Sequence, residues 1–449
     1  MIKIDSNRHY VHRPANKMVS IFRYSGAPDL ARFEEAIGLG MSKHELLCTE
    51  LYREGNEAAY YKKREDSQPV VKINIETYES VDPEEDDVET MLDIAIDWAL
   101  EENPKVYNID EGEWMHHGIF SDGNETVWAI SSHYLAGDAQ SIQFLVRDCI
   151  EIYEDLIAAP KDEAIQVEKI TPYRPESFDF AAGFKKMSFF QKRHVNSLNS
   201  KWKKSTKIFD KVDFENMNSN FHNVYKLKSL AKKLDRETTS KLLAKIKEND
   251  LSLSTIIPAS FVVSSQERET MAHTLSTREG DYEGVGVYGG SVTLPQISIL
   301  SSATDLLETA KSINKDLEPA LKDEQRIQRS NIIVANLDGN LLDSAYYSAF
   351  TDWKNVASDL MQKTFSLKSS GEGMQINNIG ELPQVKNNSF GELKEAYYIP
   401  SILPNFRRAL AFNFVDGEMF ITNTFYQDEK VELLIFNRAV EALEEFANS

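Results

Sequence analysis

The sharpest change of hydrophobic pattern in the chain lies within residues 126–156. Residues 126–134 are mostly β-branched, aromatic or small, as a partly buried strand requires, and the apolar run ends at residues 135–138. Apolar side chains then recur at helical spacing, at Ile142, Leu145, Cys149 and Ile152. The pattern predicts a strand, a short turn and a long helix, so side chains at the strand end can project into a cleft.

The rest of the chain alternates strand and helix patterns in two series, before and after a linker-like segment at residues 162–176. Strands are predicted at residues 17–24, 71–75, 114–120, 222–227, 270–277 and 284–299, and in a hairpin at residues 410–426. Helices are predicted at residues 29–41, 235–247, 255–264, 306–319, 342–363 and 436–447. We therefore expect an α/β protein with two lobes, residues 1–165 and residues 176–449.

Composition narrows the classes of partner. A chain of 449 residues is too long for one ordinary core, which agrees with two lobes. The formal net charge of −21 favours small molecules or proteins as partners and argues against nucleic acid and anionic membranes. We expect no membrane span, because no segment approaches ~20 consecutive apolar residues. The N-terminus also lacks a signal-peptide pattern. Cys48 and Cys149 are the only cysteines, so we expect buried thiols in a cytoplasmic protein without a disulfide framework.

Two charged segments have alternative interpretations. Residues 82–87 are acidic and precede a helical pattern, so we interpret them as a solvated first turn and expect no metal site there. Residues 184–211 are unusually basic, with lysines interleaved with Phe189, Phe190 and Trp202. This segment suits a docking strip for coenzyme A phosphates or an acidic carrier protein, but a solvated amphipathic helix with extended lysine side chains is the favoured interpretation.

The strand end and turn carry the candidate chemistry, His133-Tyr134-Leu135-Ala136-Gly137-Asp138-Ala139, with Ser141 in the helix that follows. This arrangement resembles the HHxxxDG core of the condensation-domain and chloramphenicol-acetyltransferase superfamily. The resemblance implies that His133, Tyr134 and Asp138 form the catalytic motif, that Gly137 is structural and that Ser141 contacts substrate. Tyr134 takes the place of the family's second histidine, which serves as general base or positions substrate. A phenol with a pKa near ~10 is ionised in about one molecule in a thousand at pH 7, so it cannot replace an imidazole base.

Two other alignments of the motif stay open. His133 becomes the second histidine if the turn holds one inserted residue, but this shift puts Ser141 and the helix out of step. His116-His117-Gly118-Ile119-Phe120-Ser121-Asp122-Gly123 also looks similar, but it has four residues between His117 and Asp122. Turn residues and another strand follow, so we interpret residues 116–123 as part of a hairpin.

Two segments of the second lobe carry further resemblance. Residues 284–295 read GVGVYGGSVTLP and resemble the family's VGxxxNTLP crossover between lobes. In that family a nearby arginine pairs with the motif aspartate, which makes Arg278 the best match for a structural partner of Asp138. Residues 375–380 read QINNIG and resemble the SNxG strand of standalone members, where glycine lets the backbone come close to the substrate. The resemblance thus implies substrate binding by Asn378 and Gly380.

The family resemblance implies two chloramphenicol-acetyltransferase-like α/β sandwich lobes that form a V around a central tunnel. It also implies direct acyl transfer from a thioester, on coenzyme A or on the phosphopantetheine arm of a carrier protein, to an amine or alcohol, with no bound cofactor. Because the motif departs from the family at Tyr134, a second hypothesis is a catalytically inactive protein that binds a carrier protein or a biosynthetic enzyme. Loss of a general base typically lowers the rate on the order of 10²–10⁴-fold, which leaves room for slow chemistry.

Overall fold

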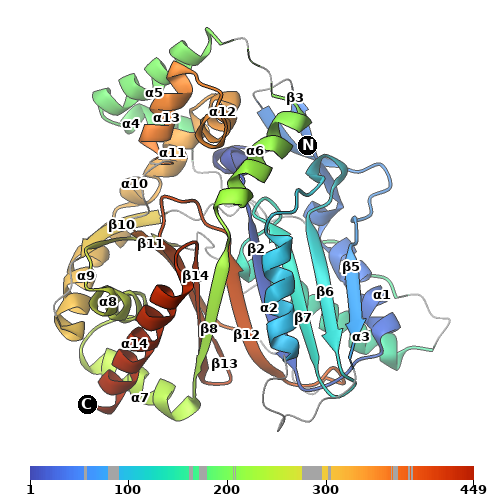
Figure 1. Ribbon diagram of the computed structural model, residues 1–449. Helices are drawn as coiled ribbons and strands as arrows, with labels where there is room; N and C mark the ends of the chain where they lie inside the picture. The colour runs from blue at the N-terminus through green and yellow to red at the C-terminus, as the bar shows by residue number, and fades with distance from the viewer. Residues whose placement is uncertain are drawn as a thin grey trace.

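Two large sheets, each covered by helices, make up most of the molecule (Figure 1). The computed structural model describes residues 1–54, 58–78, 90–160, 165–170, 179–205, 207, 209–275, 296–301, 305–365, 367, 373–382, 385 and 388–449. The sheets have five and six strands, and a third sheet has three strands. The predicted α/β class is confirmed. Within the described residues, no helix is both long and apolar enough to cross a membrane.

The first large sheet is built around the strand that ends in the motif. Its order is β12 (Leu393–Pro400), β2 (Lys17–Tyr24), β7 (Thr126–His133), β6 (Met115–Ser121) and β5 (Ile73–Thr77). Every residue of β7 is buried, because helices cover both faces of the sheet. In Figure 1, α2 (Met91–Glu102) lies in front of it and α1 (Leu30–Lys43) and α3 (Ala139–Ala158) lie behind.

Strand β12 connects the two halves of the chain. It lies in the predicted C-terminal lobe by sequence, but it pairs antiparallel with β2 of the first sheet, with Tyr398 opposite Ser20. It also lies against β13 (Arg408–Val415) and β14 (Glu418–Phe425) of the second sheet. A segment from the second half of the chain therefore completes the sheet that carries the motif.

The second large sheet has the order β10 (Gln296–Ser301), β9 (Glu269–Thr274), β11 (Gly373–Glu381), β13, β14 and β8 (Lys228–Leu234). Helices α7 (Arg236–Glu248), α8 (Leu253–Ser265), α9 (Leu306–Leu321) and α14 (Glu429–Asn448) pack with it. The core of this half contains Arg408, which donates hydrogen bonds to Glu269 (3.2 Å) and Glu432 (2.9 Å). A buried guanidinium is tolerated here because two carboxylates neutralise it.

A helical group lies above the second sheet in Figure 1 and has its own apolar core. It contains α4 (Phe180–Lys186), α5 (Phe189–Trp202), α6 (Lys211–Val224), α11 (Arg329–Ala335), α12 (Gly339–Phe350) and α13 (Val356–Thr364), with short α10 (Glu324–Ile327) joining it to α9. The small sheet contains β1 (Ile2–Ile4), β4 (Ala58–Lys63) and β3 (Thr49–Glu54). Three 3-10 helices are η1 (Ser6–Tyr10), η2 (Glu45–Cys48) and η3 (Ile109–Glu111).

Most predicted elements are confirmed, with one clear error. The predicted strand at residues 222–227 is wrong, because α6 continues to Val224 and the strand begins only at Lys228. The inward face of α6 carries Phe214, Met217 and Phe221 at helical spacing, and this period determines the structure. The hairpin containing residues 116–123 is confirmed, since β6 pairs antiparallel with β7. The linker at residues 162–176 falls mostly outside the described residues.

Candidate functional site

The motif turn is fixed by the start of α3. Asp138 is the N-cap of this helix, and its Oδ1 accepts hydrogen bonds from the backbone N–H and the hydroxyl of Ser141, both at 2.8 Å. An aspartate at this position satisfies backbone donors that the first helical turn leaves free. Ser141 is fully buried and does not line the cavity described below. The structure thus uses Ser141 to hold Asp138 in place.

A cavity of about 260 Å³ brings parts of both halves of the chain together at the motif. Tyr134, Gly137 and Asp138 line it from the turn after β7, and Asn377 and Asn378 line it from β11. The N-terminal segment contributes Tyr10 and Arg13, and residues after β12 contribute Leu403, Asn405 and Phe406. Four of the sequence-predicted site residues therefore meet at one cavity: Tyr134, Gly137, Asp138 and Asn378.

Tyr134 is held in this cavity as a neutral phenol. Its hydroxyl donates a hydrogen bond to the backbone carbonyl oxygen of Ser401 (3.0 Å), and its ring lies 5.1 Å from the ring of Tyr10. Burial raises the pKa of Tyr134 well above its usual value, although the positive charge of Arg13 opposes that rise. The group can donate a hydrogen bond and accept one, but it cannot take a proton near pH 7.

His133 faces a different space. It lines a smaller cavity of about 140 Å³ and does not line the cavity at Tyr134. Its Nδ1 accepts the backbone N–H of Leu135 (3.1 Å), and its Nε2 lies 2.9 Å from the side-chain amide nitrogen of Asn16. Burial and the charge of Lys17 lower the pKa of His133 to about 3. Both ring nitrogens contact groups of the protein, and the ring is neutral near pH 7.

Strand β11 presents two asparagines to the cavity. Asn377 is fixed, because its amide donates to the carbonyl oxygen of Leu410 (3.1 Å) and its Oδ1 accepts from the hydroxyl of Thr274 (3.0 Å). Asn378 is exposed, and among the described residues its side chain has a long contact to Ser254 (3.4 Å). Gly380 has φ +84° where the pairing of β11 with β13 shifts register, so the bend itself requires glycine. No neighbouring atom lies within 4 Å of a Cβ placed there.

Some predicted features cannot be placed. Arg278 and residues 284–295 lie outside the described residues, so the expected Asp138–Arg278 pair and the crossover between lobes stay predictions. The remaining candidate pair lies on β6: His116 contacts Glu102 (2.8 Å) and Glu113 (2.7 Å), and His117 accepts from the indole N–H of Trp128 (3.2 Å). Among the described residues, no group of three His, Cys, Asp or Glu side chains could hold a metal ion.

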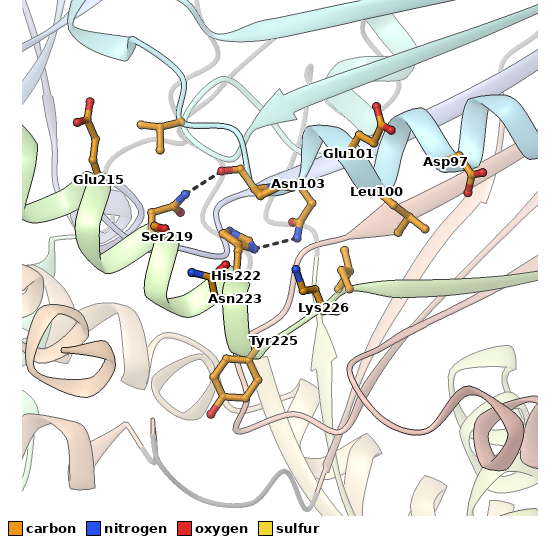
Figure 2. Close-up of a pocket in the computed structure, with 14 residues that line it drawn as sticks. Asp97, Leu100, Glu101, Asn103, Glu215, Ser219, His222, Asn223, Tyr225 and Lys226 are labelled. Atoms are coloured by element: carbon orange, nitrogen blue, oxygen red, sulfur yellow. Dashed lines mark hydrogen bonds between the residues drawn. The ribbon is translucent and has the colours of Figure 1, made fainter. Parts of the chain in front are cut away.

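A larger hollow of about 610 Å³ lies between the end of α2 and α6, where His222 approaches Asn103 (Figure 2). The amide nitrogen of Asn103 is 3.4 Å from Nδ1 of His222, and its Oδ1 accepts the hydroxyl of Ser401 at 2.5 Å. Ser401 in turn holds Tyr134 through its backbone carbonyl. Because that acceptor is a carbonyl, this series of contacts fixes the position of Tyr134 and passes no proton to it.

The comparison with known families agrees with this geometry. The sequence model of the Condensation domain matches residues 9–270, which is more than half of the chain. The protein belongs to the condensation-domain family. The match spans the motif at residues 133–139 and the whole first sheet except β12. No curated protein sequence matches this chain.

Solved structures show the same fold over nearly the full length. The first condensation domain of the calcium-dependent antibiotic synthetase superposes with a TM-score of 0.64 and 12% identity, covering 100% of this chain and 97% of that chain. Trichothecene 15-O-acetyltransferase from Fusarium sporotrichioides superposes with a TM-score of 0.66 and 11% identity, covering 99% of this chain and 95% of that chain. Polyketide synthase associated protein 5 from Mycobacterium tuberculosis superposes with a TM-score of 0.59 and 12% identity, covering 100% of this chain and 97% of that chain. At such low identity these likenesses establish the fold of this condensation-family protein and not its substrate.

The sequence missed several residues that line the cavity. Tyr10 ends η1 and Arg13 lies between η1 and β2, in a segment without hydrophobic periodicity, and Tyr398 lies on β12. Tyr398 reaches the cavity because β12 joins the first sheet, a pairing between residues more than 370 positions apart in sequence. The only local signal was the concentration of basic and aromatic residues at positions 8–13.

Proposed function

We propose that this condensation-family protein transfers an acyl group from a thioester to an amine or alcohol in the cavity at Tyr134. The observation that carries the proposal is the meeting of Tyr134 and Asp138 from the motif with Asn377 and Asn378 from β11 around one space. These groups come from separate sheets, as an active site formed between two halves of a chain requires. The donor would be a thioester of coenzyme A or of a carrier protein's phosphopantetheine arm.

An amine is the acceptor that suits this cavity best. The amine nitrogen attacks the thioester carbonyl, the carbon–sulfur bond breaks, and the thiolate leaves with the bonding electrons. The neutral form of the amine attacks, and the proton that its nitrogen loses afterwards goes to the thiolate or to water, so no side chain has to remove a proton from the neutral amine before attack. Tyr134 can accept a hydrogen bond from the amine while it donates to Ser401, and this contact orients the nucleophile. An alcohol is a weaker nucleophile and depends more on the missing base.

Turnover of acyl thioesters tests the proposal. The native protein would be incubated with acyl-coenzyme A and, separately, with an acylated carrier protein, each with mixed amines and alcohols, and products would be identified by mass spectrometry. We expect slow amide formation that is lost when Asn377→Ala alters the cavity and retained in Tyr52→Phe, which changes an exposed phenol on β3. Absence of acyl transfer from both donors would reject the proposal.

A second candidate function is recruitment of a partner without catalysis, and two observations favour it. Tyr134 provides no base. In addition, Phe189 and Phe190 at the start of α5 are 67% and 81% exposed, next to the exposed Lys185 and Lys186. Exposed aromatic and basic side chains in an otherwise acidic chain suit an acidic protein partner. Binding of an acylated carrier protein that weakens in Phe190→Ser, together with no product from any acceptor, would favour recruitment over transfer.

A further inference from the structure

Arg13 occupies the space between the two cavities at the motif. It lies in the segment between η1 and β2, and it lines both the cavity at Tyr134 and the smaller cavity at His133. Its guanidinium carbon is 5.2 Å from the ring centre of Tyr10 and 5.9 Å from that of Tyr134. The side chain is half-buried.

The charge of Arg13 has no partner within the described residues. No carboxylate lies within 4 Å of its guanidinium, its Nε is buried without a hydrogen-bond acceptor, and its terminal nitrogens make no hydrogen bond. Arg8, five positions earlier, shows how the same segment treats a structural arginine. Its two terminal nitrogens donate to the two carboxylate oxygens of Asp343 at 2.8 and 2.6 Å.

The aromatic neighbours of Arg13 do not satisfy the hydrogen-bond donors of its guanidinium. The faces of Tyr10 and Tyr134 attract a cation, but they accept none of the five N–H groups that a guanidinium directs outward in one plane. A planar anion with two oxygens matches that arrangement, because two parallel hydrogen bonds can form at once. We propose that Arg13 binds a carboxylate on the substrate, and so selects an acceptor that carries a free carboxylate close to its reacting amine or hydroxyl.

The formal charges of the side chains that line the cavity favour a carboxylate over a phosphate. Among the described residues that line the cavity, Arg13 is the arginine and Asp138 is the acid, so their formal charges sum to zero before a ligand binds. A carboxylate adds one negative charge to this site, whereas a phosphate adds nearly two beside Asp138. Because Arg13 and Tyr134 are in contact, a carboxylate on Arg13 places the reacting group only a few bonds away. The substrate class is therefore a small amino acid or hydroxy acid, an identification that rests on the proposed acyl transfer.

Binding of matched probes tests the assignment without any need for turnover. Benzoate, benzamide and phenyl phosphate have the same ring and differ in the charged group, and their affinities would be measured by titration calorimetry on the whole protein. We expect benzoate to bind at least about tenfold more tightly than benzamide, and phenyl phosphate to bind more weakly than benzoate. Arg13→Gln should remove the preference for benzoate, and Arg13→Lys should keep part of it, because a lysine supplies charge without the planar fork.

Arg438→Gln is the matched control, since Arg438 is exposed on α14 and does not line the cavity. It should leave all three affinities unchanged. Equal binding of benzoate and benzamide, or an unchanged preference in a folded Arg13→Gln protein, would overturn the assignment. A preference for phenyl phosphate would overturn it in favour of a phosphate site.

Turnover separates this inference from the proposed function. If acyl transfer is detected, Arg13→Gln should raise KM for phenylalanine at least about tenfold and leave KM for phenylalaninamide unchanged. An Arg13-dependent preference for benzoate in a protein without turnover would reject acyl transfer and keep the carboxylate site. Turnover that does not depend on Arg13 or on the acceptor's carboxylate would support acyl transfer and reject the carboxylate site.

Discussion

The two residues at the end of β7 lie next to each other in sequence but in different surroundings. His133 faces a cavity of about 140 Å³, and its two ring nitrogens meet Leu135 and Asn16. Tyr134 faces the cavity of about 260 Å³, where it lies beside Arg13. Consecutive side chains of an extended segment point to opposite sides, so one strand end serves both spaces.

The two surroundings differ in whether the polar groups of the site contact the protein or remain open to the cavity. On the His133 side, the ring accepts the backbone N–H of Leu135 and contacts the side-chain amide of Asn16, as buried structural groups do. On the Tyr134 side, Arg13 has no hydrogen-bond or ion-pair partner within the described residues, and Asn378 presents an exposed amide. The family resemblance implies that Tyr134 takes the place of the second histidine, so this departure from the motif lies on the side of the larger cavity, the open side, and His133 lies on the other, supporting side.

Tyr134→His gives the largest expected effect, because it supplies a base on the open side. We expect acyl transfer to rise on the order of 10²–10⁴-fold, measured as product formed from acyl-coenzyme A and an alcohol. Burial lowers the pKa of nearby histidines such as His133 and His222, so the new imidazole should also have a pKa below ~6.5. The rate should therefore increase with pH up to that pKa and then stay constant.

Tyr134→Gln is the control for this gain, since its amide is polar and accepts no proton. It should show no increase in transfer. Equal activities of Tyr134→His and Tyr134→Gln would show that the cavity gains nothing from a base at this position.

His133→Ala tests the supporting side. It leaves the N–H of Leu135 without its acceptor and opens a space in a buried site, so we expect the free energy of unfolding to fall by about 2–4 kcal/mol in urea titrations. His194→Ala, at an exposed position on α5, should change it by less than ~0.5 kcal/mol. Robust native turnover that His133→Ala abolishes and Tyr134→Phe leaves unchanged would instead identify His133 as the base.

The sequence predicted local elements well because their periodicity is local. The strand, turn and helix at the motif are found at Thr126–His133 and Ala139–Ala158, and residues 375–380 lie on β11 as expected. Contributions that depend on distant pairing had no such signal. Arg13 lies in a segment without a regular element, and β12 joins the first sheet through pairing with β2. The sequence therefore indicated Tyr134 and Asp138, but it could not show that Arg13 lines the same cavity without a partner among the residues that the structure describes.

The supporting side also predicts a pH dependence of stability. Burial lowers the pKa of His133 to about 3, so the unfolded chain takes up this proton near pH ~6.5 while the folded protein does not. The contribution of the neutral His133 ring to the free energy of unfolding is fully present above pH ~6.5. It decreases by about 1.4 kcal/mol per pH unit as the pH falls towards 3. His133→Gln should reduce the slope of unfolding free energy between about pH 6 and about pH 4 by that amount. An unchanged slope would show that His133 is protonated in the folded protein.

Tyr134→Phe gives the smallest expected effect and isolates the phenol itself. The ring keeps its place beside Tyr10, and only the hydrogen bond to the carbonyl of Ser401 is lost, so the free energy of unfolding should fall by about 0.5–1.5 kcal/mol. If the hydroxyl orients an amine acceptor, amide formation should decrease in this variant, while benzoate binding at Arg13 should persist. Unchanged turnover, measured beside Tyr52→Phe, would show that the phenol serves only to hold the turn. The open side of the motif would then act through Arg13 and the asparagines of β11 alone.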